Sequence, residues 1–244
     1  MQKTPRSLGR ALLRTAGHLW LMVFLIAPSF LFVSPAQAFE ALFPAHRFTS
    51  IRPDGPVLAL DQSIRIYGRL FHAGQTDYFT VHGQSGEELR LELAVPRLDG
   101  LEQFRPSIAV IGPGLPMGDR DGTYFTVPNG LGAHVIEPAA RERELVDAMS
   151  GAPFRLTQAF QFRLPAAADY YIAVFDKSGE RGKYVLHLGP AEETSVVTAL
   201  RHPIRFFEIR AWYHPTQLLA VFALAVMASA VFFAAWLGRR RKRK

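Results

Sequence analysis

Apolar and polar residues alternate over much of the chain between Ile64 and Leu188, in short runs that glycine- and proline-containing turns separate. The clearest run is LRLELAV, from Leu89 to Val95, where an apolar side chain occupies nearly every second position. Side chains of a β-strand point alternately to the two faces of a sheet. The pattern therefore predicts a sheet with one buried face and one solvated face.

The same reasoning predicts further strands. They span residues 63–71, 77–81, 107–111, 156–164, 170–175 and 183–188, with a short edge strand at 57–60. Short strands with no long helix between them indicate a mainly β fold, and we predict an antiparallel, jelly-roll-like β-sandwich over residues 57–190. Alternation places ten side chains in its core: Phe79, Val81, Leu89, Leu91, Leu93, Ile108, Val110, Tyr170, Ile172 and Val174.

The least regular part of this predicted domain is an insertion over residues 115–153. It contains a possible strand at 123–127 and a patch of helix-forming residues at 139–149, directly after Pro138. Long irregular segments on a compact scaffold often carry function. Two interpretations stay open: the insertion is a recognition surface, or it covers the edge of a sheet.

The first 38 residues have the pattern of a signal peptide. A basic start precedes an apolar stretch from Leu19 to Val33, and Ala36-Gln37-Ala38 is a small-x-small cleavage site. We predict cleavage after Ala38; an uncleaved membrane anchor is the alternative. Residues 39–56 contain three prolines and predict an extended lead-in.

An apolar segment near the C-terminus predicts a transmembrane helix over residues 216–238. Leu218 to Leu237 contains no charged residue, and its length of about 30 Å matches a hydrocarbon core. The basic tail at 239–244 favours a cytoplasmic C-terminus. Residues 191–215 predict a juxtamembrane linker; the alternative is a short interfacial helix that begins at Pro203.

Charge is distributed unevenly along the chain. The net charge is +7, but four basic residues precede the first apolar stretch and six form the tail, whereas all 21 acidic residues lie between these ends. The folded part is therefore mildly acidic, which argues against nucleic acid as a partner. The chain contains no cysteine, which excludes disulfides and thiolate metal ligands.

Two groups of motifs resemble the bacterial pre-peptidase C-terminal domain. Gly68-Arg69-Leu70, Asp77-Tyr78-Phe79 and Gly86 with Leu89 are similar to its Gly-x-Leu, Asp-Tyr-Phe and Gly-x-x-Leu motifs. The segments DYYIAV, from Asp169, and GKYVL, from Gly182, resemble its closing hairpin, although Asp169 stands where a glycine is usual. The resemblance covers Ile64 to Leu188 apart from the insertion. It implies a small β-sandwich of an exported bacterial protein.

With this resemblance, the two ends predict the location. We expect a single-pass protein of the bacterial inner (cytoplasmic) membrane, with its ectodomain in the periplasm and its C-terminus in the cytoplasm. The lipid bilayer is then one partner of the chain.

Candidates for metal binding and catalysis are few. Asp119 and Asp121 resemble the start of a calcium loop, but the later acidic ligands of such a loop are missing, so a solvated turn is favoured. No Gly-x-Ser-x-Gly nucleophile motif occurs, and Asp77 is better explained as a turn-end aspartate than as a catalytic carboxylate. We expect no cofactor and no catalytic residue.

The candidate partner-binding residues are Tyr124, Phe125, Arg141 and Arg143, all within the insertion. We expect Tyr124 and Phe125 to be exposed beside charged residues, as suits a modest protein interface. The favoured function is a non-catalytic, membrane-anchored binding or accessory module for a protein or polymer partner. The alternatives are a subunit of a larger membrane complex and a metal-dependent or hydrolytic enzyme that uses the insertion.

Overall fold

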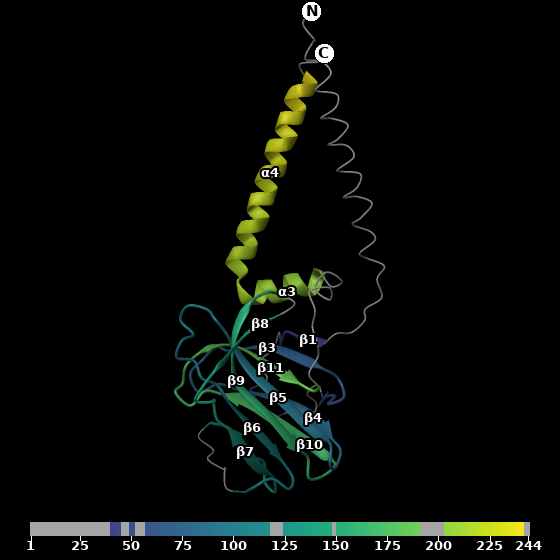
Figure 1. Ribbon diagram of the computed structural model, residues 1–244, viewed down its shortest axis with the longest axis vertical. Helices are drawn as coiled ribbons and strands as arrows, with labels where there is room; N and C mark the ends of the chain where they lie inside the picture. The colour runs from purple at the N-terminus through teal and green to yellow at the C-terminus, as the bar shows by residue number, and fades with distance from the viewer. Residues whose placement is uncertain are drawn as a thin grey trace, which may run out of the picture.

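The computed structural model describes residues 40–44, 49–51, 57–117, 124–147, 150–190 and 203–241. Two β-sheets pack face to face, and two helices extend from one end of the sandwich (Figure 1). The predicted signal peptide, residues 1–38, lies outside the described residues.

The two sheets contain six and five strands. Sheet A contains, in spatial order, β1 (Glu40–Leu42), β3 (Ile64–Leu70), β11 (Gly182–Leu188), β5 (Glu88–Pro96), β9 (Pro153–Arg163) and β8 (Arg143–Val146). Sheet B contains β2 (Val57–Leu58), β4 (Thr76–Gly83), β10 (Ala168–Phe175), β6 (Ser107–Gly112) and β7 (Gly132–Ile136). The helices are α3 (Pro203–Tyr213) and α4 (Pro215–Arg241).

The mainly β sandwich is confirmed, but its sheets are mixed rather than purely antiparallel. β1 pairs with β3, and β2 with β4, in parallel, whereas all other pairs are antiparallel among the described strands. The first four strands alternate between the sheets, A then B then A then B. After each of the first two strands the chain passes through the other sheet before it returns to the first. Such a crossover connection permits the two strands that it joins to pair in parallel.

The core lies between the sheets, and the predicted alternation is confirmed there. All ten side chains expected to face inward belong to the buried cluster between the sheets. Leu91 is fully buried, whereas its neighbour Arg90 is exposed. The leucines of β5 therefore face the core, and its charged residues lie on the outer face of sheet A.

Three motif segments far apart in the sequence meet at one point in this core. The Tyr184 hydroxyl donates to the Asp77 carboxylate at 2.7 Å, and the Gln75 amide donates to the same carboxylate at 2.7 Å. A Cβ atom added to Gly68 would lie 2.2 Å from the Tyr184 ring. A glycine is therefore required at position 68 because the aromatic ring occupies the space of a side chain.

The insertion at 115–153 is more regular than its sequence indicates. It supplies β7 to sheet B and β8 to sheet A. The helical patch predicted at 139–149 is wrong, since residues 143–146 pair with β9 and the Glu142 carboxylate accepts from Arg155 Nη1 at 2.9 Å. Cross-strand pairing outweighs helix propensity in this segment. Within the possible strand at 123–127, the described residues 124–127 form no strand.

Candidate functional site

The helix α3 packs on the outer face of sheet A. Its Ile209 and Tyr213 are buried against Tyr67, Val185 and Phe154, which come from three strands of the sheet. Figure 1 shows α3 lying across the end of the sandwich, between the sheets and α4. The segment before the candidate span is thus a docked helix over residues 203–213.

Polar contacts fix the C-terminal end of α3. Lys183 Nζ donates to the carbonyl oxygens of Trp212 at 2.6 Å and Tyr213 at 3.2 Å, which have no partner within the helix. The cation also lies 5.4 Å from the centre of the Trp212 ring. The Tyr213 hydroxyl lies 3.0 Å from the carbonyl oxygen of Arg97 and 3.1 Å from that of Pro153. A lysine at a helix C-terminus also interacts favourably with the helix dipole.

Asp147, which follows β8, reaches across the same outer face. β8 forms one edge of sheet A and β3 lies next to the opposite edge, yet Asp147 accepts from Arg65 Nη1 of β3 at 2.8 Å. Asp147 also accepts from the backbone N–H of Ser150 at 2.8 Å. Ala152 belongs to the buried cluster beneath α3. Asp147 and residues 150–152 therefore lie on the outer face of sheet A, on the side where α3 packs.

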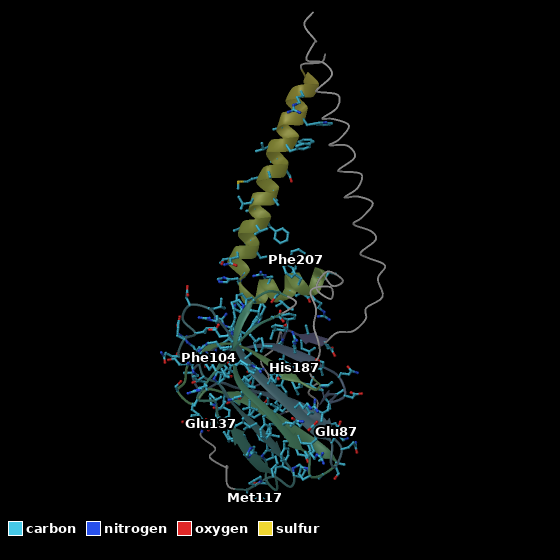
Figure 2. All side chains as sticks on the ribbon, viewed as in Figure 1. Glu87, Phe104, Met117, Glu137, His187 and Phe207 are labelled. Carbon is cyan, nitrogen blue, oxygen red and sulfur yellow. The ribbon has the colours of Figure 1, made fainter. Side chains whose placement is uncertain are left out.

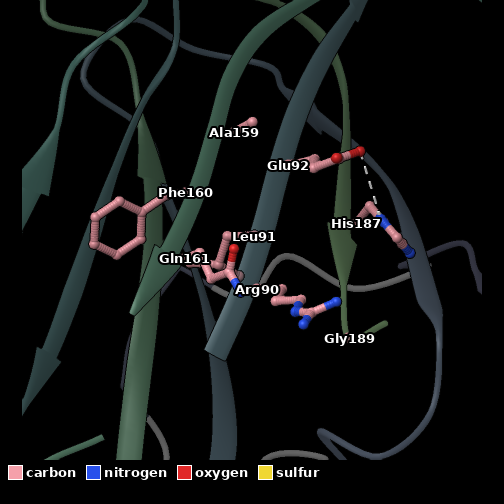
Figure 3. Close-up of a pocket in the computed structure, with 8 residues that line it drawn as sticks. All are labelled: Arg90, Leu91, Glu92, Ala159, Phe160, Gln161, His187 and Gly189. Carbon is pink, nitrogen blue, oxygen red and sulfur yellow. Dashed lines mark ion pairs between the residues drawn. The ribbon is translucent and has the colours of Figure 1, made fainter. Parts of the chain in front are cut away.

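A pocket of about 280 Å³ lies on the outer face of sheet A. It is lined by Arg90, Leu91, Glu92, Ala159, Phe160, Gln161, His187 and Gly189, from β5, β9 and the end of β11 (Figure 3). His187 and Glu92 lie only two residues along their strands from Val185 and Ala94, which α3 covers. At about 3.3 Å per residue the pocket thus begins about 7 Å from the helix-covered patch.

Charged groups converge on Glu92 in this pocket. The contact with His187, whose Nδ1 lies 3.7 Å from Glu92 Oε2, lowers the pKa of the Glu92 carboxyl below its ordinary value of 4.5. The charges of Arg143 and Arg65 lower this pKa further, although partial burial opposes them. The pocket therefore holds a carboxylate whose ionised form is favoured by His187 within the pocket and by the charges of two arginines outside its lining.

A second carboxylate, that of Glu88, binds two of the side chains that line the pocket. Glu88 accepts from Arg90 Nε at 2.9 Å and also from the Gln161 amide. These two donors lower the pKa of the partly exposed Glu88 carboxyl, with Arg90 as the largest cause. Arg90 and Gln161 are thereby held in place with free hydrogen-bonding capacity toward a ligand.

Three side chains here have the order of a hydrolytic triad. Ser63 Oγ lies 2.9 Å from His187 Nε2, and His187 faces Glu92. Yet Ser63 is only 5 % exposed, and it is not among the residues that line the pocket. A nucleophile must reach its substrate. The geometry therefore supports a structural hydrogen bond that orients the imidazole, rather than an acyl-transfer site.

The structure separates the sequence-predicted site residues. Arg143 lies on β8, and its charge acts on Glu92, while the adjoining Arg141 is exposed. Tyr124 and Phe125 instead pack against Phe175 on the outer face of sheet B. The expected exposure of Phe125 is wrong, because the side chain is 4 % exposed.

The metal candidates Asp119 and Asp121 lie outside the described residues. Among the residues that are described, no group of three or more His, Asp and Glu side chains is arranged to hold a metal ion. Asp77 lies on β4 rather than at a turn end, and its partners include side chains, Gln75 and Tyr184.

The pocket itself was not predicted from the sequence. Its polar residues occupy alternate positions of β5 and β9 and the outward position 187 of β11, as on any solvated sheet face. Their convergence depends on strand order and register, which juxtapose Glu92 with both His187 and Ala159. The one sequence signal was that the outer positions of β5 alternate arginine and glutamate.

Searched as a sequence, the chain matches no protein-family model and no curated protein. Solved structures that it resembles include a periplasmic inhibitor of g-type lysozyme from Aeromonas hydrophila. That structure is 13 % identical, with a TM-score of 0.32, and the match covers 62 % of this chain and 96 % of the other. A surface-associated copper-binding protein of Methylomicrobium album is 12 % identical, with a TM-score of 0.26, and the match covers 64 % and 100 %.

The pre-peptidase C-terminal domain of a collagenase from Bacillus anthracis is also among them. It is 14 % identical, with a TM-score of 0.29, and the match covers 63 % of this chain and 99 % of that domain. The family that the sequence motifs of this chain resemble is therefore represented among the similar solved structures.

Proposed function

We propose that this protein is a membrane-anchored, non-catalytic binding module of the periplasm. It presents the outer face of sheet A to a protein or polymer partner. The recognition surface is the pocket together with Arg143 and Arg141 of the insertion. The observation that carries the proposal is the accessible, charged pocket on the part of the face that α3 leaves uncovered.

The pocket chemistry favours binding over turnover. The most accessible polar side chains of the pocket are Arg90, Glu92 and Gln161, and these groups form hydrogen bonds and ion pairs. The hydroxyl closest to a base is that of Ser63, which is buried. A flat sheet face with fixed charged groups suits an extended or polymeric ligand of mixed charge.

The helix α4 supports the anchoring part of the proposal. It is long and apolar enough to cross a membrane over Pro215–Ala234, with a mean hydropathy of 2.3, and none of this window is buried within the protein. A helix that is apolar all round and unburied suits a lipid environment. Between Leu218 and Ala234 the one polar side chain is that of Ser229. Its hydroxyl donates to the carbonyl oxygen of Ala225 at 2.8 Å.

Capture of partners by the full-length protein in mild detergent tests the proposal. The variant Arg90→Glu with Arg143→Glu reverses the charge of one pocket residue and of one exposed residue of β8, and we expect capture to be lost with the thermal midpoint retained. Arg181→Glu is the matched control, since Arg181 is exposed and precedes the far end of β11. Capture that survives in the double variant contradicts the proposal.

Point substitutions suit this test better than removal of the insertion. Residues 115–153 contribute a strand to each sheet, so their deletion would disturb folding and binding together. Arg143, in contrast, is exposed. Substitutions at exposed sites ordinarily change the free energy of unfolding by less than about 0.5 kcal/mol.

A further inference from the structure

The exposed side of α3 carries apolar side chains that the sandwich does not cover. Ile204 is 70 % exposed and Phe207 is 46 % exposed, whereas Ile209 on the opposite side is fully buried. Figure 2 shows Phe207 on the side of α3 that faces away from the sheets. Large apolar side chains gathered on one exposed side of a helix indicate an interaction surface.

This apolar side is continuous with the candidate span. The Phe207 ring lies 6.2 Å from the Phe222 ring of α4, and Phe222 is itself 54 % exposed. Leu219, one turn earlier, is 69 % exposed. The two helices thus form one apolar surface, made by Ile204 and Phe207 of α3 with Leu219 and Phe222 of α4.

The position of α3 along the span identifies what this surface contacts. Only His214 separates α3 from α4, and the apolar window begins at Pro215. The window has 20 residues, which corresponds to about 30 Å, the full thickness of a hydrocarbon core. All 20 residues of the window are needed to cross the hydrocarbon, and only one residue connects the window to α3. The boundary of the hydrocarbon therefore falls at the level of α3.

The polar residues of α3 agree with this depth. Glu208 is exposed and pairs with Arg205 Nη1 at 3.3 Å, and Arg210 lies 5.8 Å from the centre of the Phe206 ring. Paired charges beside aromatic rings are typical of helices at the lipid headgroup level, whereas hydrocarbon disfavours charged side chains.

We propose that α3 is a membrane-interface helix. It lies in the headgroup layer with Ile204 and Phe207 inserted toward the acyl chains, and its opposite side is fixed to sheet A. This inference rests on the proposed anchoring by α4. The lipid contact and the docked sheet together determine which way the pocket faces relative to the bilayer.

Site-specific labelling tests the inference, and the absence of cysteine from the chain makes it direct. Single variants Ile204→Cys, Phe207→Cys, Leu224→Cys and Met117→Cys carry an environment-sensitive fluorophore in the full-length protein. The protein is reconstituted into vesicles of phosphatidylethanolamine and phosphatidylglycerol. Quenching by brominated acyl chains is compared with quenching by aqueous iodide.

Leu224 and Met117 are the two reference positions. Leu224 lies in α4 and is 60 % exposed, whereas Met117 is 56 % exposed at the end of the sandwich farthest from α3 (Figure 2). We expect brominated lipid to quench the labels at positions 204 and 207 several-fold more than the label at 117. Iodide should show the reverse order.

The other outcomes separate the possible failures. Labels at 204 and 207 that behave like the label at 117, while 224 is quenched by lipid, overturn the interface helix and leave the anchor intact. A label at 224 that iodide quenches overturns the anchor itself. Labels at 204 and 207 protected from both quenchers show that protein rather than lipid covers these positions, which also contradicts the lipid contact.

Discussion

Tyr184 is the residue on which several of the recognisable motifs converge. Its ring fills the space beside Gly68, and its hydroxyl donates to Asp77 in the core. Burial, followed by the adjacent Asp77 charge, raises the pKa of the Tyr184 hydroxyl well above its ordinary value. The phenol therefore stays protonated and serves as a donor to the carboxylate. A buried carboxylate without its donor is costly.

The variants Tyr184→Phe and Gly68→Ala separate the two parts of this contact. Tyr184→Phe keeps the ring and removes the donor, and we expect a loss of about 1–3 kcal/mol in the free energy of unfolding. Gly68→Ala should cost about 1–3 kcal/mol as well, because the ring must move away from the new Cβ atom. Denaturant titration of the full-length protein measures both. A Gly68→Ala protein as stable as the wild type contradicts the close contact.

Glu92 gives the pocket a pH dependence with a defined sign. Its pKa in the folded state lies below the ordinary value of 4.5, mainly because of the contact with His187. The ionised carboxylate therefore stabilises the folded protein above that pH, and this contribution is lost as the pH falls through the folded-state pKa. Arg65 and Arg143 act on the same carboxylate in the same direction.

The variant Glu92→Gln tests this sign. We expect the difference in unfolding free energy between wild type and variant to be largest near about pH 6 and to shrink toward about pH 3. Thermal or denaturant unfolding at several pH values measures it. A difference that is constant or grows toward acid pH shows that His187 and the arginines do not stabilise the charged form.

At the scale of elements, α3 has one side that packs and one that does not. Ile209 is fully buried against sheet A, and Ile204 on the same helix is 70 % exposed. Truncation of a buried isoleucine to alanine typically costs about 2–5 kcal/mol, whereas exposed substitutions cost less than about 0.5 kcal/mol. The two residues form a matched pair because they have the same side chain.

We expect Ile209→Ala to release α3 from the sandwich and Ile204→Ala to leave it docked. Limited trypsin digestion in detergent reports the release, since Arg205 and Arg210 lie within the helix and are half-buried. Faster cleavage of Ile209→Ala alone is the expected result. Equal cleavage rates of both variants would show that the buried side of α3 contributes little to docking.

The elements that the sequence predicted are those with alternating or continuous apolar residues between turns. β2, β3, β4, β5, β6, β9, β10 and β11 all overlap predicted strands. β1, β7 and β8 were missed because three to five residues, paired at sheet edges, give too short a pattern. In β8 the sequence RELV has strong helix formers, and only its pairing with β9 makes it a strand.

The candidate site was less predictable than the fold. Arg143 was singled out as one of a charged group, but its effect on the pKa of Glu92 depends on the pairing of β8 with β9 in sheet A. Phe125 was expected at the surface, and it is buried because sheet B offers Phe175 on its outer face. Contacts between residues far apart in sequence decided both outcomes.

At the scale of the whole molecule, the proposed topology is directly testable. We expect a reporter fused after Lys244 to be active in the cytoplasm and inactive in the periplasm, because the basic residues that follow α4 favour the cytoplasmic side. Paired fusions to alkaline phosphatase and to a fluorescent protein measure this in cells. Alkaline phosphatase activity at this position contradicts the topology.

The cap that Lys183 places on α3 has a consequence for encounters at the bilayer. The last turn of α3 is bonded to the sheet, and a single residue separates α3 from α4. No flexible linker therefore lies between α3 and α4. In the proposed anchoring, the pocket stays at one height above the lipid. A partner embedded in the same membrane then meets it by lateral diffusion at high effective concentration, provided that its binding segment reaches that height. A partner held nearer to or farther from the lipid is excluded, whatever its chemistry.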